Sequence, residues 1–205
     1  MLFSVSTTAV IRIGRGRGFV VQGFEAYVIT VARCLPEMPV LGEEQLYRDL
    51  LGPIDADPMV SAECLFYDRV ADLAVLGVPG DIMVGGPPDY ILKPRVDYEA
   101  LVRSVTPLSI AEPTWPMGQT QMSASLPLHD RRRVQCTVSD HGRWLMMDGI
   151  EPGQRVDDNM LGSPFVASDG SAIGVLGRGH HHPRLDRHLP GWLLSEVRAR
   201  QASSV

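Results

Sequence analysis

The residues most suited to chemistry are three consecutive histidines near the C-terminus, His180, His181 and His182. Consecutive imidazoles suggest a metal site, because zinc takes histidine nitrogens among its three or four protein ligands. In an extended chain, however, neighbouring side chains point to opposite faces, so only His180 and His182 converge. Two ligands are fewer than zinc needs. The pattern favours a loop over a metal site, and no metal or other cofactor is predicted.

A hydroxyl and an imidazole offer a second kind of chemistry. Ser163 could act as a nucleophile if a nearby imidazole took its proton, either His141 or one of the three consecutive histidines. His141 lies in the turn-like segment SDHG, where a solvated hairpin residue is the simpler interpretation. A hydrolase with such a rearranged set of catalytic residues therefore stays open as an alternative function.

Two clusters rich in arginine have simple structural interpretations. Residues 131–133 are three arginines ahead of an expected strand, which indicates a solvated hairpin more than a contact for an anion or an acidic peptide. Residues 14–18, GRGRG, superficially resemble a nucleotide-binding loop. Their spacing is not G-x-G-x-x-G and they lead into a strand, so close backbone packing at a barrel turn explains them better.

Composition excludes several classes of partner. The 205 residues are 44% apolar and 21% charged, as in globular proteins, and their net charge is −5. No overall basic field is present to hold a nucleic acid or an anionic membrane, so neither is predicted as a partner. The chain has no positively charged start and no apolar run long enough to cross a membrane. Cys34, Cys64 and Cys136 are far apart and are expected to be reduced thiols in a cytoplasmic protein.

The elements that must position these residues are mostly strands. Short runs of β-branched and aromatic residues alternate with Gly, Pro, Asp and Glu, which predicts strands. In the first half they cover residues 7–13, 18–22, 26–30, 59–67 and 73–78, and in the second half 119–125, 133–139, 143–147, 164–168 and 172–177. Neither face of residues 59–67 is purely polar, which suits a closed or doubly covered sheet.

Other segments depart from the period of two. Leucines at helical spacing predict a short surface helix within residues 43–51, and Trp192, Leu193, Leu194 and Val197 predict a closing amphipathic helix. Prolines and glycines between residues 79 and 107 are interpreted as a crossing that is neither a central strand nor a helix interior. We therefore expect two parts in one unit, residues 1–95 and residues 96–205.

Three segments carry motifs in a meaningful order. They are GRGFVV (16–21) followed by YVITVARCLP (27–36), then DRVADLAVL (68–76), then NMLGSPFV (159–166) followed by SDGSAIGV (168–175). Together they resemble the chymotrypsin-like (trypsin-fold) serine proteases over roughly residues 7–200. The resemblance implies an all-β fold, a double six-stranded β-barrel with a C-terminal helix. It also implies that Cys34 follows the histidine position, although residues 18–22 contain no cysteine to pair with it.

The same resemblance implies that the catalytic residues are missing. Arg33 stands at the histidine position, Asp72 at the aspartate position and Leu161 at the serine position. A guanidinium has no acceptor lone pair and stays protonated near neutral pH, and leucine has no nucleophilic atom. The oxyanion loop also departs from the family pattern, with Asn159 in place of glycine and Met160 in place of aspartate. An ion pair between Asp72 and Arg33 is expected to replace the His–Asp hydrogen bond.

We therefore expect a pseudoprotease that binds a peptide or a protein partner through the former substrate cleft or an exposed strand edge. Besides the hydrolase alternative, a purely architectural subunit of a larger assembly stays open. The residues expected to lie along the cleft or contact a ligand are Arg155, Ser163, Arg178, His180 and His182. Arg155 falls near the family's specificity pocket, and Ser163, two positions beyond Leu161, is expected to pack beneath the loop.

Overall fold

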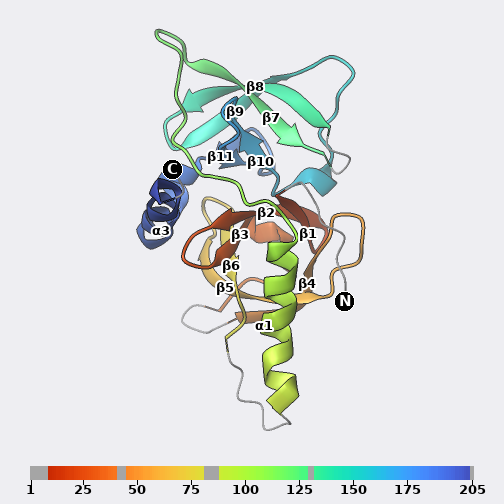
Figure 1. Cartoon of the computed structure of the whole chain (residues 1–205). Helices are drawn as coiled ribbons and strands as arrows, with labels where there is room; N and C mark the ends of the chain where they lie inside the picture. Colours follow the sequence, from red (N-terminus) through yellow and green to blue (C-terminus); the bar gives the residue numbers. More distant parts are fainter. Residues whose placement is uncertain (1–8, 41–44, 81–87, 129–131, 204–205) are drawn as a thin grey trace.

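The computed structural model describes residues 9–40, 45–80, 88–128 and 132–203. Most of these residues form two six-stranded β units that are stacked end to end, with one long helix against the first unit and one at the junction (Figure 1). The arrangement confirms the predicted double barrel with a C-terminal helix.

The first unit is a closed antiparallel barrel in the order β1-β2-β3-β6-β5-β4. Its strands are β1 (Val10–Ile13), β2 (Gly16–Gln22), β3 (Ala26–Thr30), β4 (Gln45–Gly52), β5 (Val60–Asp68) and β6 (Leu73–Gly77). Phe19, Ile29 and Leu73 are fully buried, and β6 is buried along its whole length. Burial of every residue of β6 fits its continuous apolar sequence, because both faces of the strand are covered.

The short helix predicted within residues 43–51 is wrong, because β4 occupies Gln45–Gly52 and pairs with both β5 and β1. The register shifts between Tyr47 and Leu51, and Asp49 has a φ of 50°. This irregularity turns both Leu50 and Leu51 inward, so they are buried beside each other. The resulting apolar spacing imitates a helix although the backbone is extended.

The interpretation of residues 79–107 as a crossing without a helix interior is also wrong. Helix α1 (Pro88–Arg103) contains Pro94 in its interior. Tyr98 and Leu101 are buried against the first barrel, and the Tyr98 hydroxyl donates a hydrogen bond of 2.8 Å to the carbonyl oxygen of Ala26. Packing of this face offsets the hydrogen bond that proline cannot make. The expected division after residue 95 falls inside this helix.

The second unit is a six-stranded sheet in the order β11-β10-β7-β8-β9-β12. A bridge between Gly174 and Arg184 nearly closes it into a second barrel. The strands are β7 (Gln121–Pro127), β8 (Arg133–His141), β9 (Trp144–Ile150), β10 (Pro164–Val166), β11 (Ala172–Val175) and β12 (His181–Pro183). Leu126, Val138 and Phe165 lie in its core.

The two units are joined by chain that packs on both. After α1, Leu108 donates a backbone hydrogen bond to Val20 in β2, and Ala111 donates one to Ala172 in β11. The chain then ends with the one-turn helix α2 (Leu185–His188) and α3 (Gly191–Ala202). Although α3 follows the second unit, Leu193 and Val197 are buried in the core cluster of the first. Within the described residues, no helix is long and apolar enough to span a membrane.

Candidate functional site

The positions that the motifs singled out meet where the two units touch. Arg33 lies in the short helix η1 (Ala32–Cys34) after β3, and Asp72 lies in the turn between β5 and β6. The predicted contact between them is present: Nε of Arg33 donates to Oδ2 of Asp72 at 2.5 Å. The backbone N–H of Arg33 also donates to Oδ1 of Asp72, and that of Ala32 to its carbonyl oxygen. Three hydrogen bonds therefore fasten η1 to this turn.

The environment of Asp72 is costly for a carboxylate. Its side chain is only 17% exposed, and its φ of 56° lies in the left-handed region that asparagine and aspartate tolerate better than most residues. Burial raises the pKa of Asp72, while the Arg33 guanidinium and its hydrogen bonds act in the opposite direction. The arginine thus holds the carboxylate in an ion pair, and the guanidinium itself has only donors and no acceptor lone pair.

Leu161 follows the short helix η2 (Asp158–Met160) and reaches the first barrel through its backbone. Its carbonyl oxygen accepts a hydrogen bond of 2.7 Å from the N–H of Arg17 in β2. The next residue, Gly162, has a φ of 89°, and a Cβ there would lie 1.9 Å from the carbonyl oxygen of Arg17. This loop is therefore pressed against β2, and only glycine fits at residue 162.

The backbone N–H groups of this loop are turned inward. Met160 donates to the carbonyl oxygen of Asp157, Leu161 to that of Asp158 at 3.3 Å, and Gly162 to that of Leu176. An oxyanion hole needs N–H groups that point at an empty position, including the N–H of the residue at the nucleophile position. Here the N–H of Leu161 is used within the turn. Met160 is buried, whereas Asn159 is exposed.

Ser163 is fully buried. Its backbone is fixed by hydrogen bonds from its N–H to Met160 and from the N–H of Leu176 to its carbonyl oxygen. Its hydroxyl oxygen has no hydrogen-bond partner among the described residues. A hydroxyl enclosed in this way, with no base beside it, lacks the geometry of an activated nucleophile.

The three consecutive histidines differ in their surroundings because two of them belong to β12. His180 and His181 are exposed, and β12, which includes His181 and His182, pairs with β9. The expected loop is thus partly wrong, because two of the three histidines belong to a strand. His182 is 1% exposed, and its Nδ1 accepts a hydrogen bond from the N–H of Gly177, so the proton of the neutral ring lies on Nε2. Burial lowers the pKa of His182 to about 4.

The remaining expected contacts are dispersed. Arg155 and Arg178 are both exposed, and neither forms an ion pair within the described part of the chain. His141 is exposed at the end of β8, in the hairpin that was expected there. Of the arginine cluster at residues 131–133, residue 131 lies outside the described residues. Among residues 9–40, 45–80, 88–128 and 132–203, no group of His, Cys, Asp and Glu side chains is arranged to hold a metal ion.

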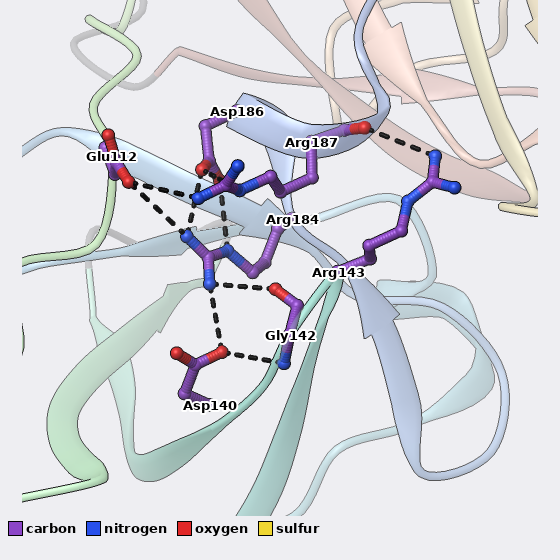
Figure 2. Close-up of polar contacts among 7 residues, drawn as sticks. All are labelled: Glu112, Asp140, Gly142, Arg143, Arg184, Asp186 and Arg187. Atoms are coloured by element: carbon purple, nitrogen blue, oxygen red, sulfur yellow. Dashed lines mark hydrogen bonds and ion pairs between the residues drawn. The ribbon is translucent and has the colours of Figure 1, made fainter.

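The sequence interpretation missed two arginines that are buried. Arg184, directly after β12, is 4% exposed and is surrounded by acidic side chains (Figure 2). It pairs with Asp186 through two nitrogens, at 3.1 and 2.9 Å, and its Nη1 contacts Asp140 at 2.9 Å and the carbonyl oxygen of Gly142 at 2.9 Å. This network holds β12 and α2 against the hairpin between β8 and β9. The only sequence signal for this network is the mixture of Arg, Asp and His in residues 184–188.

The second missed arginine is Arg17, which is 7% exposed and lines a cavity of about 360 Å³ together with Arg12, Arg15, Asp55 and Asn159. The sequence offered a signal in residues 12–17, where three arginines alternate with Ile and Gly. The interpretation of residues 14–18 as close backbone packing at a turn accounts for the glycines but not for these arginines.

Comparisons with known proteins find similar structures but no similar sequences. The sequence matches no protein-family profile and no curated protein. The structure is similar to that of a human pathogenic astrovirus serine protease, with 15% identity over 88% of this chain and 91% of that chain and a TM-score of 0.48. It is also similar to Deg5, with 17% identity over 89% of this chain and 86% of that chain and a TM-score of 0.51.

The two stacked six-stranded units, the strand order and the likeness to Deg5 define a chymotrypsin-like fold. At the positions that the motifs align, this chain has an arginine–aspartate ion pair and a leucine that follows a closed turn. The ion pair lies within the first unit, whereas the loop at Leu161 joins the second unit to β2 of the first.

Proposed function

We propose that this chain is a pseudoprotease, a non-catalytic protein of the chymotrypsin-like fold that binds a peptide or a segment of a partner protein beside the junction of its barrels. The observation that carries the proposal is the ion pair between Arg33 and Asp72. In a working triad the aspartate orients an imidazole that accepts a proton. A guanidinium in its place keeps its protons near neutral pH and cannot act as a base.

Two further observations support the absence of catalysis. Leu161 has no nucleophilic atom, and its N–H is used by Asp158 instead of being free to stabilise an oxyanion. Ser163, the hydroxyl nearest to it in sequence, is buried without a partner. Binding needs none of these groups, because an extended peptide can be held by main-chain hydrogen bonds to a strand edge. The edge strands of the second unit are β11 and β12, which are bridged to each other between Gly174 and Arg184, while Ala172 of β11 is also bridged to Ile110.

The first test asks whether any serine is activated. We expect no covalent labelling of the purified protein by a fluorophosphonate probe, and no cleavage of a fluorogenic peptide library. Labelling at Ser163 or another serine would overturn the proposal in favour of a rearranged hydrolase. The double variant Arg33→His/Leu161→Ser is expected to recover little activity because the turn at residues 158–161 uses the necessary N–H. Strong recovery would show that this turn opens in solution.

The second test asks whether the protein binds peptides. We expect a display library of random peptides to yield binders with a shared motif, and the best one to shift the amide NMR signals of residues 159–162 and 177–179. Signals on the far side of the first barrel, such as those of β5, serve as the internal control. Failure to enrich any motif would overturn the binding role and favour an architectural subunit. In that case a stoichiometric partner would remain bound after substitution of the cleft residues.

A further inference from the structure

Arg17 stands out because it is a buried cation with no ion-pair partner among the described residues. Buried charges are normally paired, since removing an isolated ion from water is costly. The guanidinium of Arg17 donates one hydrogen bond within the described part of the chain, from Nη1 to the carbonyl oxygen of Pro127 at 3.2 Å. No described carboxylate lies within ion-pairing distance of it. Asp55 and Asp157 act on its charge only from farther away.

Arg184 provides an internal comparison. It is equally buried, at 4% exposure against 7% for Arg17. Its guanidinium is within ion-pairing distance of three carboxylates, those of Asp186, Asp140 and Glu112 (Figure 2). Within the described part of the chain, Arg184 therefore has three acidic partners, whereas Arg17 has none within ion-pairing distance. Burial lowers the pKa of Arg17, yet a guanidinium remains charged near neutral pH.

Two more arginines face the same space. Arg12 and Arg17 are direct cross-strand partners in the β1–β2 hairpin, where like charges repel each other. Arg12 contacts Asp57 at 3.4 Å, but that carboxylate is 91% exposed and screens the pair weakly. Arg15, in the turn of the hairpin, is exposed and has no ion-pair partner among the described residues.

These three arginines line the cavity of about 360 Å³, and among the described residues of its lining only Asp55 is acidic. The volume is larger than one carboxylate or phosphate group needs, and it accommodates the side chain that carries the group. Asn159 lines the same cavity, and Arg17 also donates its N–H to Leu161. The cavity therefore lies next to the junction where we place peptide binding.

We propose that this cavity, defined by Arg12, Arg15 and Arg17, binds an oxyanion carried by a peptide: the carboxylate of an acidic side chain or the phosphate of a phosphorylated one. Guanidinium groups bind both through paired N–H···O hydrogen bonds. The anion neutralises the charge of Arg17 and relieves the repulsion between Arg12 and Arg17. This proposal extends the proposed function by naming the chemical class of the ligand, and it rests on that function only for the peptide to which the anion belongs.

The first experiment tests the anion site without a peptide. The full-length protein is titrated with inorganic phosphate and, separately, with acetate, with sodium chloride keeping the ionic strength constant. We expect saturable shifts in the NMR signals of the Arg15 and Arg17 Nε–H groups and of the Asn159 amide. Arg15→Gln should weaken phosphate binding about tenfold, since a charge-assisted hydrogen bond is lost. Arg198→Gln removes an exposed arginine on α3 and should leave the affinity unchanged.

Arg15 is the preferred position for substitution because it is exposed and has no ion-pair partner among the described residues. Arg17→Gln also breaks the hydrogen bond to Pro127 and so tests the site less cleanly. Shifts that do not saturate, or equal affinity in wild type and Arg15→Gln, would overturn the anion site.

The second experiment distinguishes a carboxylate from a phosphate as the bound anion. It also distinguishes failure of the anion site from failure of peptide binding. The best peptide from the display selection is made with Glu, Gln, phosphoserine or Ser at each position in turn. We expect Glu or phosphoserine at one position to bind about tenfold more tightly than its neutral counterpart, and Arg15→Gln to remove the difference. If neutral and charged peptides bind equally, the anion site is wrong and peptide binding stands. If phosphate binds at Arg15 but no peptide does, the anion site stands and the proposed peptide-binding function fails.

Discussion

At the scale of single residues, Arg33 and Asp72 form an ion pair that fastens η1 to the turn between β5 and β6. The arginine side chain is 40% exposed and the aspartate 17%, so solvent screens the pair in part. We expect a double-mutant cycle with Arg33→Gln and Asp72→Asn to give a coupling of about 1 kcal/mol in urea unfolding, falling as salt is added. Asparagine tolerates the left-handed backbone at residue 72. Asp72→Ala should therefore lower the free energy of unfolding by about 1 kcal/mol more than Asp72→Asn does. A coupling of zero, or one that is independent of salt, would contradict the ion pair.

His182 predicts a pH dependence of stability. An unfolded histidine takes up a proton near its ordinary pKa of 6.5, but burial lowers the pKa of His182 to about 4 in the folded protein. Between these values the unfolded state binds more protons, so the free energy of unfolding falls as the pH falls from 6.5 to 4, by about 3 kcal/mol in all, and this contribution levels off below that range.

The measurement is urea unfolding at several pH values from 7 to 4. His182→Gln retains an acceptor for the N–H of Gly177 but cannot be protonated, so its stability should decline less than that of the wild type in this window. His180→Gln, at an exposed position, should follow the wild-type curve. Identical slopes in wild type and His182→Gln would show that His182 is protonated in the folded state.

At the scale of elements, the network around Arg184 secures β12 and α2 (Figure 2). Arg184→Met leaves Asp186, which is 4% exposed, without its best partner, and should lower the free energy of unfolding by about 3 kcal/mol. Arg187→Gln is a matched control, because Arg187 contacts the same aspartate but is 53% exposed, and it should cost less than about 1 kcal/mol. An equal loss of unfolding free energy in the two variants would contradict a stabilising role for the buried Arg184–Asp186 pair.

At the scale of the whole molecule, the contact between Gly162 and β2 decides how the barrels meet. Gly162 and Gly179 both have a positive φ, but only Gly162 would bring a Cβ against backbone, at 1.9 Å from the Arg17 carbonyl. Gly179→Ala should therefore cost about 1 kcal/mol for backbone strain alone. Gly162→Ala should cost roughly 2 kcal/mol more, because the loop must move away from the first barrel.

Thermal unfolding and limited proteolysis test this difference. The Gly162→Ala variant should be cleaved faster between residues 104 and 120, the segment that runs from α1 to β7 across the junction, while Gly179→Ala should resemble the wild type. If both variants lose the same stability and resist the protease equally, the close approach at Gly162 does not hold the two barrels together.

Much of the fold was predictable because its signals are local. Alternation along β5 and β8 follows from the period of two, and the spacing of Leu193 and Val197 follows from the helical turn. Two elements could not be predicted in this way. In β4 the irregularity at Asp49 breaks the alternation, and α1 forms despite Pro94 because Tyr98 and Leu101 find a barrel to cover. Both depend on partners that are far away in sequence.

The sequence by itself determined the residue types at the positions that the motifs align, which are Arg33, Asp72 and Leu161. Only the tertiary structure decided that Leu161 uses its N–H within a turn, that His182 is enclosed and neutral, and that Arg17 is buried near two other arginines with no described carboxylate in ion-pairing distance. The reason is physical. Residue identity sets which protons and charges a side chain has, but burial and the distance to other charges set their free energy, and these arise only when distant segments pack together.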